Sequence, residues 1–113
     1  MPSRGCLVHH KSAEVGGTVL DFSNQPTYVG SIEFANTTAA LAYVQIFWKA
    51  AASVTLGTTV ADVVIGLPAS GGMALSFPDE GWRTQGTDWS MAVTTTRTGL
   101  TAALTSVTVW KKN

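Results

Sequence analysis

Two adjacent histidines, His9 and His10, are the first residues of the chain whose chemistry suggests a metal site. Neutral imidazole is the commonest metal ligand in proteins. Neighbouring residues of a β-strand point to opposite faces, so both rings can bind one metal ion only if the strand is irregular there. The sequence has no Cys-x-x-Cys and no His-Glu-x-x-His motif to supply further ligands. We therefore expect no metal centre.

The carboxylates Asp79, Glu80 and Asp88 are candidates for a calcium site or for the acid pair of a hydrolase. Their spacing matches no calcium-binding loop, and Pro78 to Gly81 has the composition of a turn. Nothing in the sequence indicates the raised carboxyl pKa that a glycoside hydrolase needs in one of its two acids. The prediction is a turn.

Nucleophilic and phosphate-binding motifs are also absent from the sequence. There is no Gly-x-Ser-x-Gly, and Ser70-Gly71-Gly72 lacks the lysine and the following helix of a phosphate loop. The single cysteine, Cys6, can form no intramolecular disulfide and is expected to be a small buried apolar residue. We predict no enzyme activity and no cofactor.

The composition limits the partners of the chain. Its 113 residues fit one domain. Charged residues make up 12% of it, against about 25% in ordinary soluble domains, and the formal net charge is zero. This balance does not fit a nucleic-acid binder, and no apolar run is long enough for a secretion signal or a membrane span. Either abundant Thr and Ser keep this surface hydrated, or partner subunits cover it.

The elements expected to position these residues are strands. Thr and Val are abundant, and turn residues recur every eight to twelve positions, as in a sandwich or barrel. No βαβ unit is predicted, so we expect an all-β fold: a single antiparallel β-sandwich or jelly-roll-like domain over residues 13–113, preceded by an N-terminal arm or first strand over residues 1–12. About eight strands are predicted, at 5–10, 18–22, 28–35, 41–48, 60–66, 73–77, 88–95 and 106–111.

The run 41–48 differs from the other predicted strands because both of its faces are apolar. Tyr43 and Phe47 point one way, while Val44 and Ile46 point the other. A strand that is apolar on both faces is covered on both faces, which suggests a central strand with a partner chain behind it. A helix over 41–52 is the alternative, because the run is rich in alanine.

Tryptophan is abundant for so short a chain and is enriched at the centres of interfaces. Trp82 lies beside Gly81 and Arg83 in a predicted loop and is the strongest surface candidate, as an interface anchor or as a platform for sugars. In the last strand Val107 and Val109 alternate with Thr108 and Trp110, which places that tryptophan opposite the two valines. The candidate interface residues are Trp48, Trp82, Trp89, Trp110 and Phe47.

From about Tyr28 onward, over about three-quarters of the chain, the sequence resembles a group of small structural proteins of tailed bacteriophages and prophages. Two departures are Ser53, where that group suggests proline, and the ending Val109 to Asn113, where it suggests tyrosine. The matching segments are Tyr28 to Thr37 with its Asn-Thr turn, Leu41 to Ala50 ending in Lys-Ala, the Gly-Thr connector Val54 to Val60, the Leu-Pro-Ala-Gly turn Ile65 to Gly72, and Gly81 to Gly86 followed by Trp89 to Thr94.

The resemblance implies a virion component, made in the host cytoplasm. Our leading hypothesis is a capsid decoration (cement) protein on the capsid surface, whose partners are its own copies in a homotrimer and the major capsid protein or other virion proteins. No nucleic-acid or membrane partner is expected. A tail, neck or fibre component is one alternative, and a carbohydrate-binding β-sandwich is another.

Overall fold

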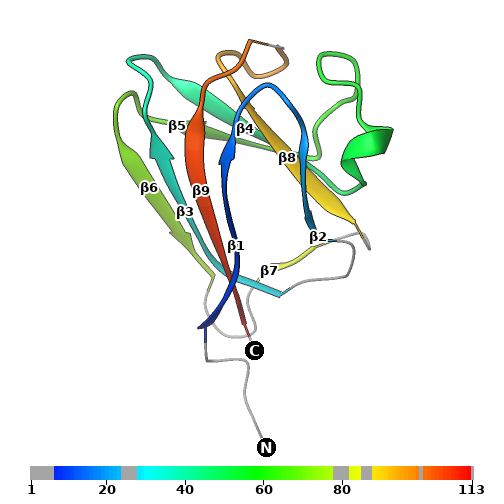
Figure 1. Cartoon of the computed structure of the whole chain (residues 1–113), viewed down its shortest axis with the longest axis vertical. Helices are drawn as coiled ribbons and strands as arrows, with labels where there is room; N and C mark the ends of the chain where they lie inside the picture. Colours follow the sequence, from blue (N-terminus) through cyan, green and yellow to red (C-terminus); the bar gives the residue numbers. More distant parts are fainter. Residues whose placement is uncertain (1–6, 24–27, 78–81, 85–87, 100, 113) are drawn as a thin grey trace, which may run out of the picture.

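The structure is a computed structural model that describes residues 7–23, 28–77, 82–84, 88–99 and 101–112. Almost all of its regular structure is β (Figure 1). The elements in chain order are β1 (Leu7–Val15), β2 (Leu20–Ser23), β3 (Tyr28–Asn36), β4 (Ala42–Phe47), the short 3-10 helix η1 (Ala51–Ser53), β5 (Val63–Leu67), β6 (Gly72–Ser76), β7 (Trp82–Arg83), β8 (Trp89–Thr94) and β9 (Thr105–Lys112).

The strands form two antiparallel sheets packed face to face. Sheet A has the order β1-β9-β3-β6, with β7 paired to the start of β3, and sheet B has the order β2-β8-β4-β5. The connections β1–β2, β3–β4, β5–β6 and β8–β9 each pass from one sheet to the other. This is the strand order of a jelly roll. The predicted antiparallel β-sandwich of about eight strands is confirmed, with β7 as a two-residue addition that the sequence pattern did not indicate.

The core between the sheets follows from side-chain alternation along the strands. In β3, Ile32 and Phe34 are buried while Glu33 and Ala35 are exposed, because successive residues point to opposite faces. Val107 and Val109 of β9 are buried in the same way, as predicted. Most of the core is aliphatic, and its largest fully buried side chain is the indole of Trp89.

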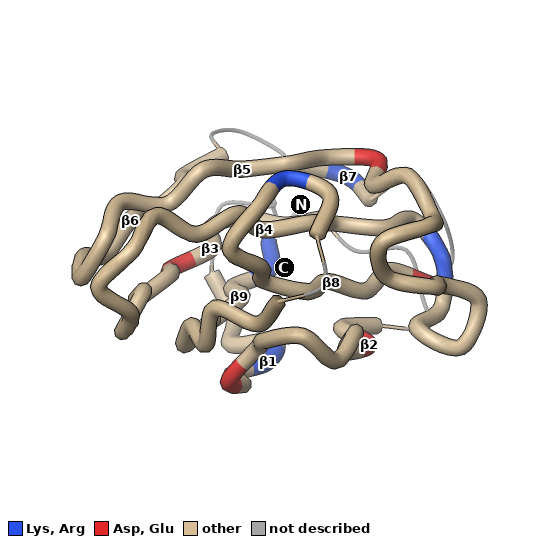
Figure 2. Tube along the Cα trace, turned by 90° about the horizontal axis from the view of Figure 1, so that it is seen from above, with Lys and Arg blue, Asp and Glu red and all other residues tan. Residues whose placement is uncertain are grey.

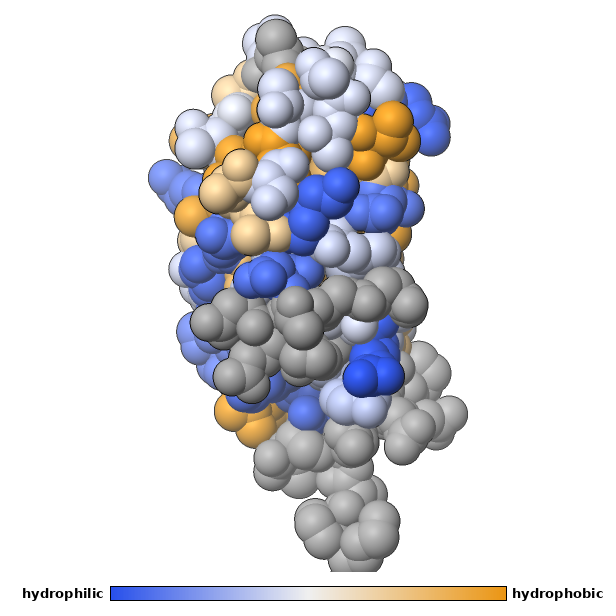
Figure 3. All heavy atoms as spheres, turned by 90° about the vertical axis from the view of Figure 1, so that its right-hand side faces the viewer, coloured by the Kyte–Doolittle hydropathy of each residue, from blue (hydrophilic) through white to orange (hydrophobic). Residues whose placement is uncertain are grey.

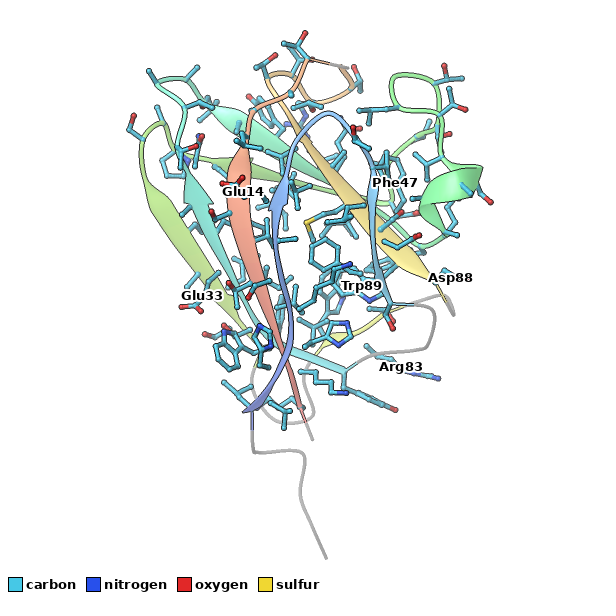
Figure 4. All side chains as sticks on the ribbon, in the orientation of Figure 1. Glu14, Glu33, Phe47, Arg83, Asp88 and Trp89 are labelled. Carbon is cyan, nitrogen blue, oxygen red and sulfur yellow. The ribbon has the colours of Figure 1, made fainter. Side chains whose placement is uncertain are left out.

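The outer face of sheet B is covered by the chain itself. Phe47 is fully buried but lies outside the main core, on the face of β4 opposite Val44 and Ile46 (Figure 4). Gln45 Nε2 donates to Thr94 Oγ1 at 2.8 Å and to the Gly99 carbonyl at 3.4 Å. Both faces of β4 are covered, as the sequence predicted. On that face the chain itself covers Gln45 and Phe47, whereas Tyr43 stays partly exposed, and the partner chain behind the strand stays a prediction.

The segment after β4 is held against sheet B by hydrogen bonds at both of its ends. Ser90 Oγ donates to the Lys49 carbonyl at 2.8 Å, and the Ala51 amide donates to Asp21 Oδ1 at 2.7 Å. The Trp48 amide donates to Asp62 Oδ2 at 2.8 Å. Within the range predicted alternatively as a helix, 41–52, residues 42–47 therefore form a strand, and the helical part is the single 3-10 turn 51–53.

Side chains at a bulge in β1 connect the edge strands of the two sheets, β1 and β2. The register with β9 shifts between His9 and Lys11, so His10 is an extra residue in β1. The His10 ring nitrogen Nε2 lies 2.6 Å from the Phe22 carbonyl of β2, and the Lys11 ammonium donates to the Asp21 carbonyl. Side chains of β1 thus bond to backbone carbonyls of β2 without a backbone ladder between the two strands.

The N-terminal boundary differs from the predicted division at residue 12. β1 runs from Leu7 to Val15 and pairs with β9 along its length, so residues 7–12 belong to sheet A as a first strand. Residues 1–6, which include Cys6, lie outside the described residues. No helix in the described part of the chain is long and apolar enough to cross a membrane.

Candidate binding surfaces

Two of the five candidate interface residues are enclosed by the fold. Trp89 and Phe47 have no exposed surface, so in the folded chain they cannot anchor a partner, and this part of the prediction is corrected. Trp89 stacks against His10 with ring centroids 6.5 Å apart and lies 5.2 Å from Phe22. Among the residues that the structure describes, its buried indole Nε1 has no hydrogen-bond partner.

Trp48 and Trp82 form a second aromatic contact, continuous with the core. They are half-buried and meet edge to face, with ring centroids 5.2 Å apart. Trp82 also lies 5.2 Å from Phe77, and all three pack against the main core. Trp82 was expected in an exposed loop. It lies instead in β7, where pairing of β7 with β3 holds its ring against other aromatics.

Trp110 is the candidate that lies on an open sheet surface. It is on the outer face of sheet A, where alternation along β9 places it opposite the buried Val109. Its indole Nε1 donates to Glu33 Oε1 at 2.8 Å, and the His9 ring meets it edge to face at 5.3 Å. The tryptophan is therefore held in one orientation while part of its surface stays exposed.

The hydroxyls of Ser12 and Thr108 lie on the same face and extend the hydrogen bonds from His9 across the sheet. Ser12 Oγ donates to Thr108 Oγ1 at 3.2 Å, and His9 Nε2 lies 2.8 Å from Ser12 Oγ. Because the single Ser12 proton goes to Thr108, His9 must donate its Nε2 proton to Ser12. Ser12 is thus not activated as a nucleophile by a histidine base. We call His9, Ser12, Glu33, Thr108 and Trp110 the Trp110 face.

The two histidines diverge, as expected from strand geometry. His9 lies on the outer face of sheet A, whereas His10 points to the seam between β1 and β2. Within the described ranges no three His, Cys, Asp or Glu side chains gather as a metal site would require. Asp79 and Glu80, considered above for calcium, lie outside those ranges.

A third surface is the end of the sandwich formed by the loops at the top of Figure 1, which we call the loop end. It comprises residues 16–19, 37–41, 54–61, 68–71, 95–99 and 101–104, and Arg97 is the one charged residue among them. Arg97 lies over the Tyr43 ring at 5.9 Å. Seen from above, the tube is almost entirely uncharged over these loops (Figure 2). Leu41, Val60 and Leu104 are 49%, 85% and 46% exposed there.

Hydrogen bonds join the loops of this end to one another. The buried Asn36 amide nitrogen donates to the carbonyls of Ala40 and Pro68, at 2.9 Å each. The Ser70 amide donates to the Thr38 carbonyl at 2.8 Å, and Thr37 Oγ1 donates to the Leu104 carbonyl at 3.0 Å. Three loops of this end, 37–41, 68–71 and 101–104, are therefore tied together. Pale and orange residues predominate there, whereas blue ones gather lower on the side shown in Figure 3.

Sequence reasoning singled out Trp110 but missed its neighbours His9, Ser12 and Glu33. Alternation in β9 indicates that Thr108 and Trp110 share a face. No local signal shows that β1 and β3 are the strands on either side. Comparison with known proteins adds nothing to this geometry, because no family model, no curated protein and no solved structure matches the chain.

Proposed function

We propose that this protein is a virion structural protein of a tailed bacteriophage and acts as a capsid decoration, or cement, protein. The resemblance that begins at Tyr28 suggests the class of protein. The observation that carries the proposal for this molecule is the loop end, an almost uncharged end of the sandwich with exposed leucines and a valine.

An uncharged surface suits a permanent protein contact. Burying a charge costs free energy unless it finds a partner, and the centres of interfaces are depleted of charged residues. The loop end offers Thr, Ala, Gly and Leu side chains, which lose their hydration at little cost. A standard interface buries about 1,600 Å² in total, an area that a few such loops can supply together with the facing coat subunits.

In this proposal the loop end faces the shell, and three copies of the chain form a closed cluster that clamps neighbouring coat subunits. The stabilisation comes from shape complementarity and apolar area. Capsids that lack the protein should then rupture at a lower temperature than capsids that carry it. Equal rupture temperatures with and without bound protein would reject the decoration function.

A tail, neck or fibre component would use the same physics at another place in the virion. Electron microscopy with a labelled antibody against the protein separates the two positions. Label on heads supports the decoration proposal, whereas label confined to tails selects the alternative.

A further inference from the structure

The Trp110 face carries a donor, an acceptor and an aromatic surface side by side. Glu33 of β3 is directly opposite Thr108 of β9 in the register, so their Cβ atoms are about 5 Å apart. Two residues before Glu33 on β3, Ser31 lies directly opposite Trp110 of β9. The indole therefore lies next to the Glu33–Thr108 pair on the outer face of sheet A.

The hydrogen bonds already formed leave defined positions for a ligand. Glu33 accepts the indole proton through Oε1, which leaves the other carboxylate oxygen as an acceptor. Thr108 accepts from Ser12, and its own proton has no acceptor among the described residues. One hydrogen-bond acceptor and one donor thus remain free on adjacent strands, both at the edge of a fixed indole.

This combination suits a hydroxyl-bearing ring. A sugar hydroxyl both donates and accepts, so neighbouring hydroxyls can bond to Glu33 and Thr108 together, while the apolar face of the ring packs on the indole. The Glu33 carboxylate at the edge of the indole disfavours an anionic ligand, because like charges brought together repel each other. A quaternary ammonium ligand fits this site less well than a sugar does, because such a ligand is typically held by a cage of several aromatic rings.

We propose that the Trp110 face binds a neutral pyranose sugar, whose ring stacks on Trp110 and whose hydroxyls bond to Glu33 and Thr108. The site is open and shallow, so its affinity is in the millimolar range. This inference differs from the sequence-based expectation, which gave the sugar platform to Trp82, and it does not depend on where in a virion the protein lies.

Nuclear magnetic resonance on the full chain tests the site directly, because the Trp110 indole N–H is itself a probe. The ligands to titrate are D-glucose, D-galactose, D-mannose and N-acetyl-D-glucosamine, with glucuronate and choline as charged comparisons. At least one neutral sugar should shift the Trp110 indole resonance in a saturable way. Glucuronate should bind more weakly than glucose, because its carboxylate meets Glu33.

Three variants make the test specific. Thr108→Val keeps the β-branched shape and removes the free hydroxyl, so it should weaken binding several-fold. Trp110→Ala removes the platform and should weaken binding at least about tenfold, read from the Thr108 backbone amide. Trp82→Phe, at another half-buried tryptophan, is the matched control and should bind as the native chain does. The dispersion of the spectra verifies that each variant is folded.

Three results would overturn the proposal. They are a Trp110 indole resonance that none of the four neutral sugars moves, a response to choline alone, and a Trp110→Ala variant that binds sugar as tightly as the native chain.

Discussion

At the scale of single residues, His10 is a side chain whose ionisation is coupled to the fold. Its ring bridges the two sheets, with Nε2 bonded to the Phe22 carbonyl and its plane stacked on Trp89. Because a carbonyl can only accept, this nitrogen carries the proton of the neutral ring. Burial lowers the pKa of His10 below its ordinary value of 6.5, the hydrogen bond to Phe22 opposes this, and the positive charges of Lys111 and Lys11 lower it further.

The pH dependence of stability follows from the direction of this shift. The unfolded chain takes up a proton at His10 at higher pH than the folded chain does, so the His10 contribution to stability is complete above pH 6.5. It falls as the pH decreases through the folded-state pKa. We expect the free energy of unfolding, measured with urea, to decrease between about pH 8 and about pH 5.

His10→Gln separates this effect from that of the carboxylates. Glutamine retains an N–H donor for the Phe22 carbonyl but does not titrate, so the decrease in the free energy of unfolding should be smaller in the variant. Identical pH profiles for the two proteins would show that His10 does not couple ionisation to folding.

At the scale of elements, the connection after β4 depends on Phe47. The ring is fully buried although it lies outside the core between the sheets. Phe47→Ala should lower the free energy of unfolding by about 3–5 kcal/mol, as for a residue of the main core. Amide hydrogen exchange over 48–62 should also increase, because this segment begins directly after Phe47 and is bonded to Ser90, the register partner of Phe47, through the Lys49 carbonyl.

Phe34→Ala is the matched control for Phe47, because Phe34 lies in the main core between the sheets. It should cost a similar free energy without a selective increase in exchange over 48–62. If Phe47→Ala left both stability and exchange unchanged, the buried outer face of sheet B would be energetically unimportant.

The loop end depends in the same way on Asn36. This side chain is 3% exposed, donates to two carbonyls and accepts from the amide and hydroxyl of Thr38 at 3.0 and 2.7 Å. Asn36→Ala removes four part-buried hydrogen bonds and should cost about 3 kcal/mol in chemical denaturation. Thr37→Val removes one exposed hydrogen bond, to the Leu104 carbonyl, and should cost less than about 1 kcal/mol. Equal losses for both would contradict the role of Asn36.

At the scale of the whole molecule, the proposed function predicts a discrete assembly. The native mass of the purified protein at micromolar concentration should correspond to a closed trimer. A chain that remains monomeric over the whole concentration range would remove self-assembly from the proposal.

The orientation on the shell is tested separately from the assembly. Leu104→Lys puts a charge on the loop end and should weaken binding to capsids, because that charge would be desolvated without a partner. Ala74→Lys puts the same charge on the exposed outer face of sheet A and should have little effect. Capsid binding that is unchanged in Leu104→Lys would mean that another surface faces the shell.

The sequence by itself determined the strands, because side-chain periodicity is a local property. Alternation in 106–111 indicates which side chains face the core, and the doubly apolar run at 41–48 indicates a strand covered on both faces; the structure has these strands at 105–112 and 42–47. The missed strand β7 is only two residues long, too short for a period to show.

Tertiary structure alone decided which strands are neighbours and what covers them. His9, Glu33 and Trp110 come together because β9 inserts between β1 and β3, a pairing between residues far apart in the chain. The burial of Trp89 and Phe47 likewise depends on distant segments that fold over them. Both residues were predicted as interface anchors because they are aromatic. Their burial results from non-local packing, which the sequence pattern does not show.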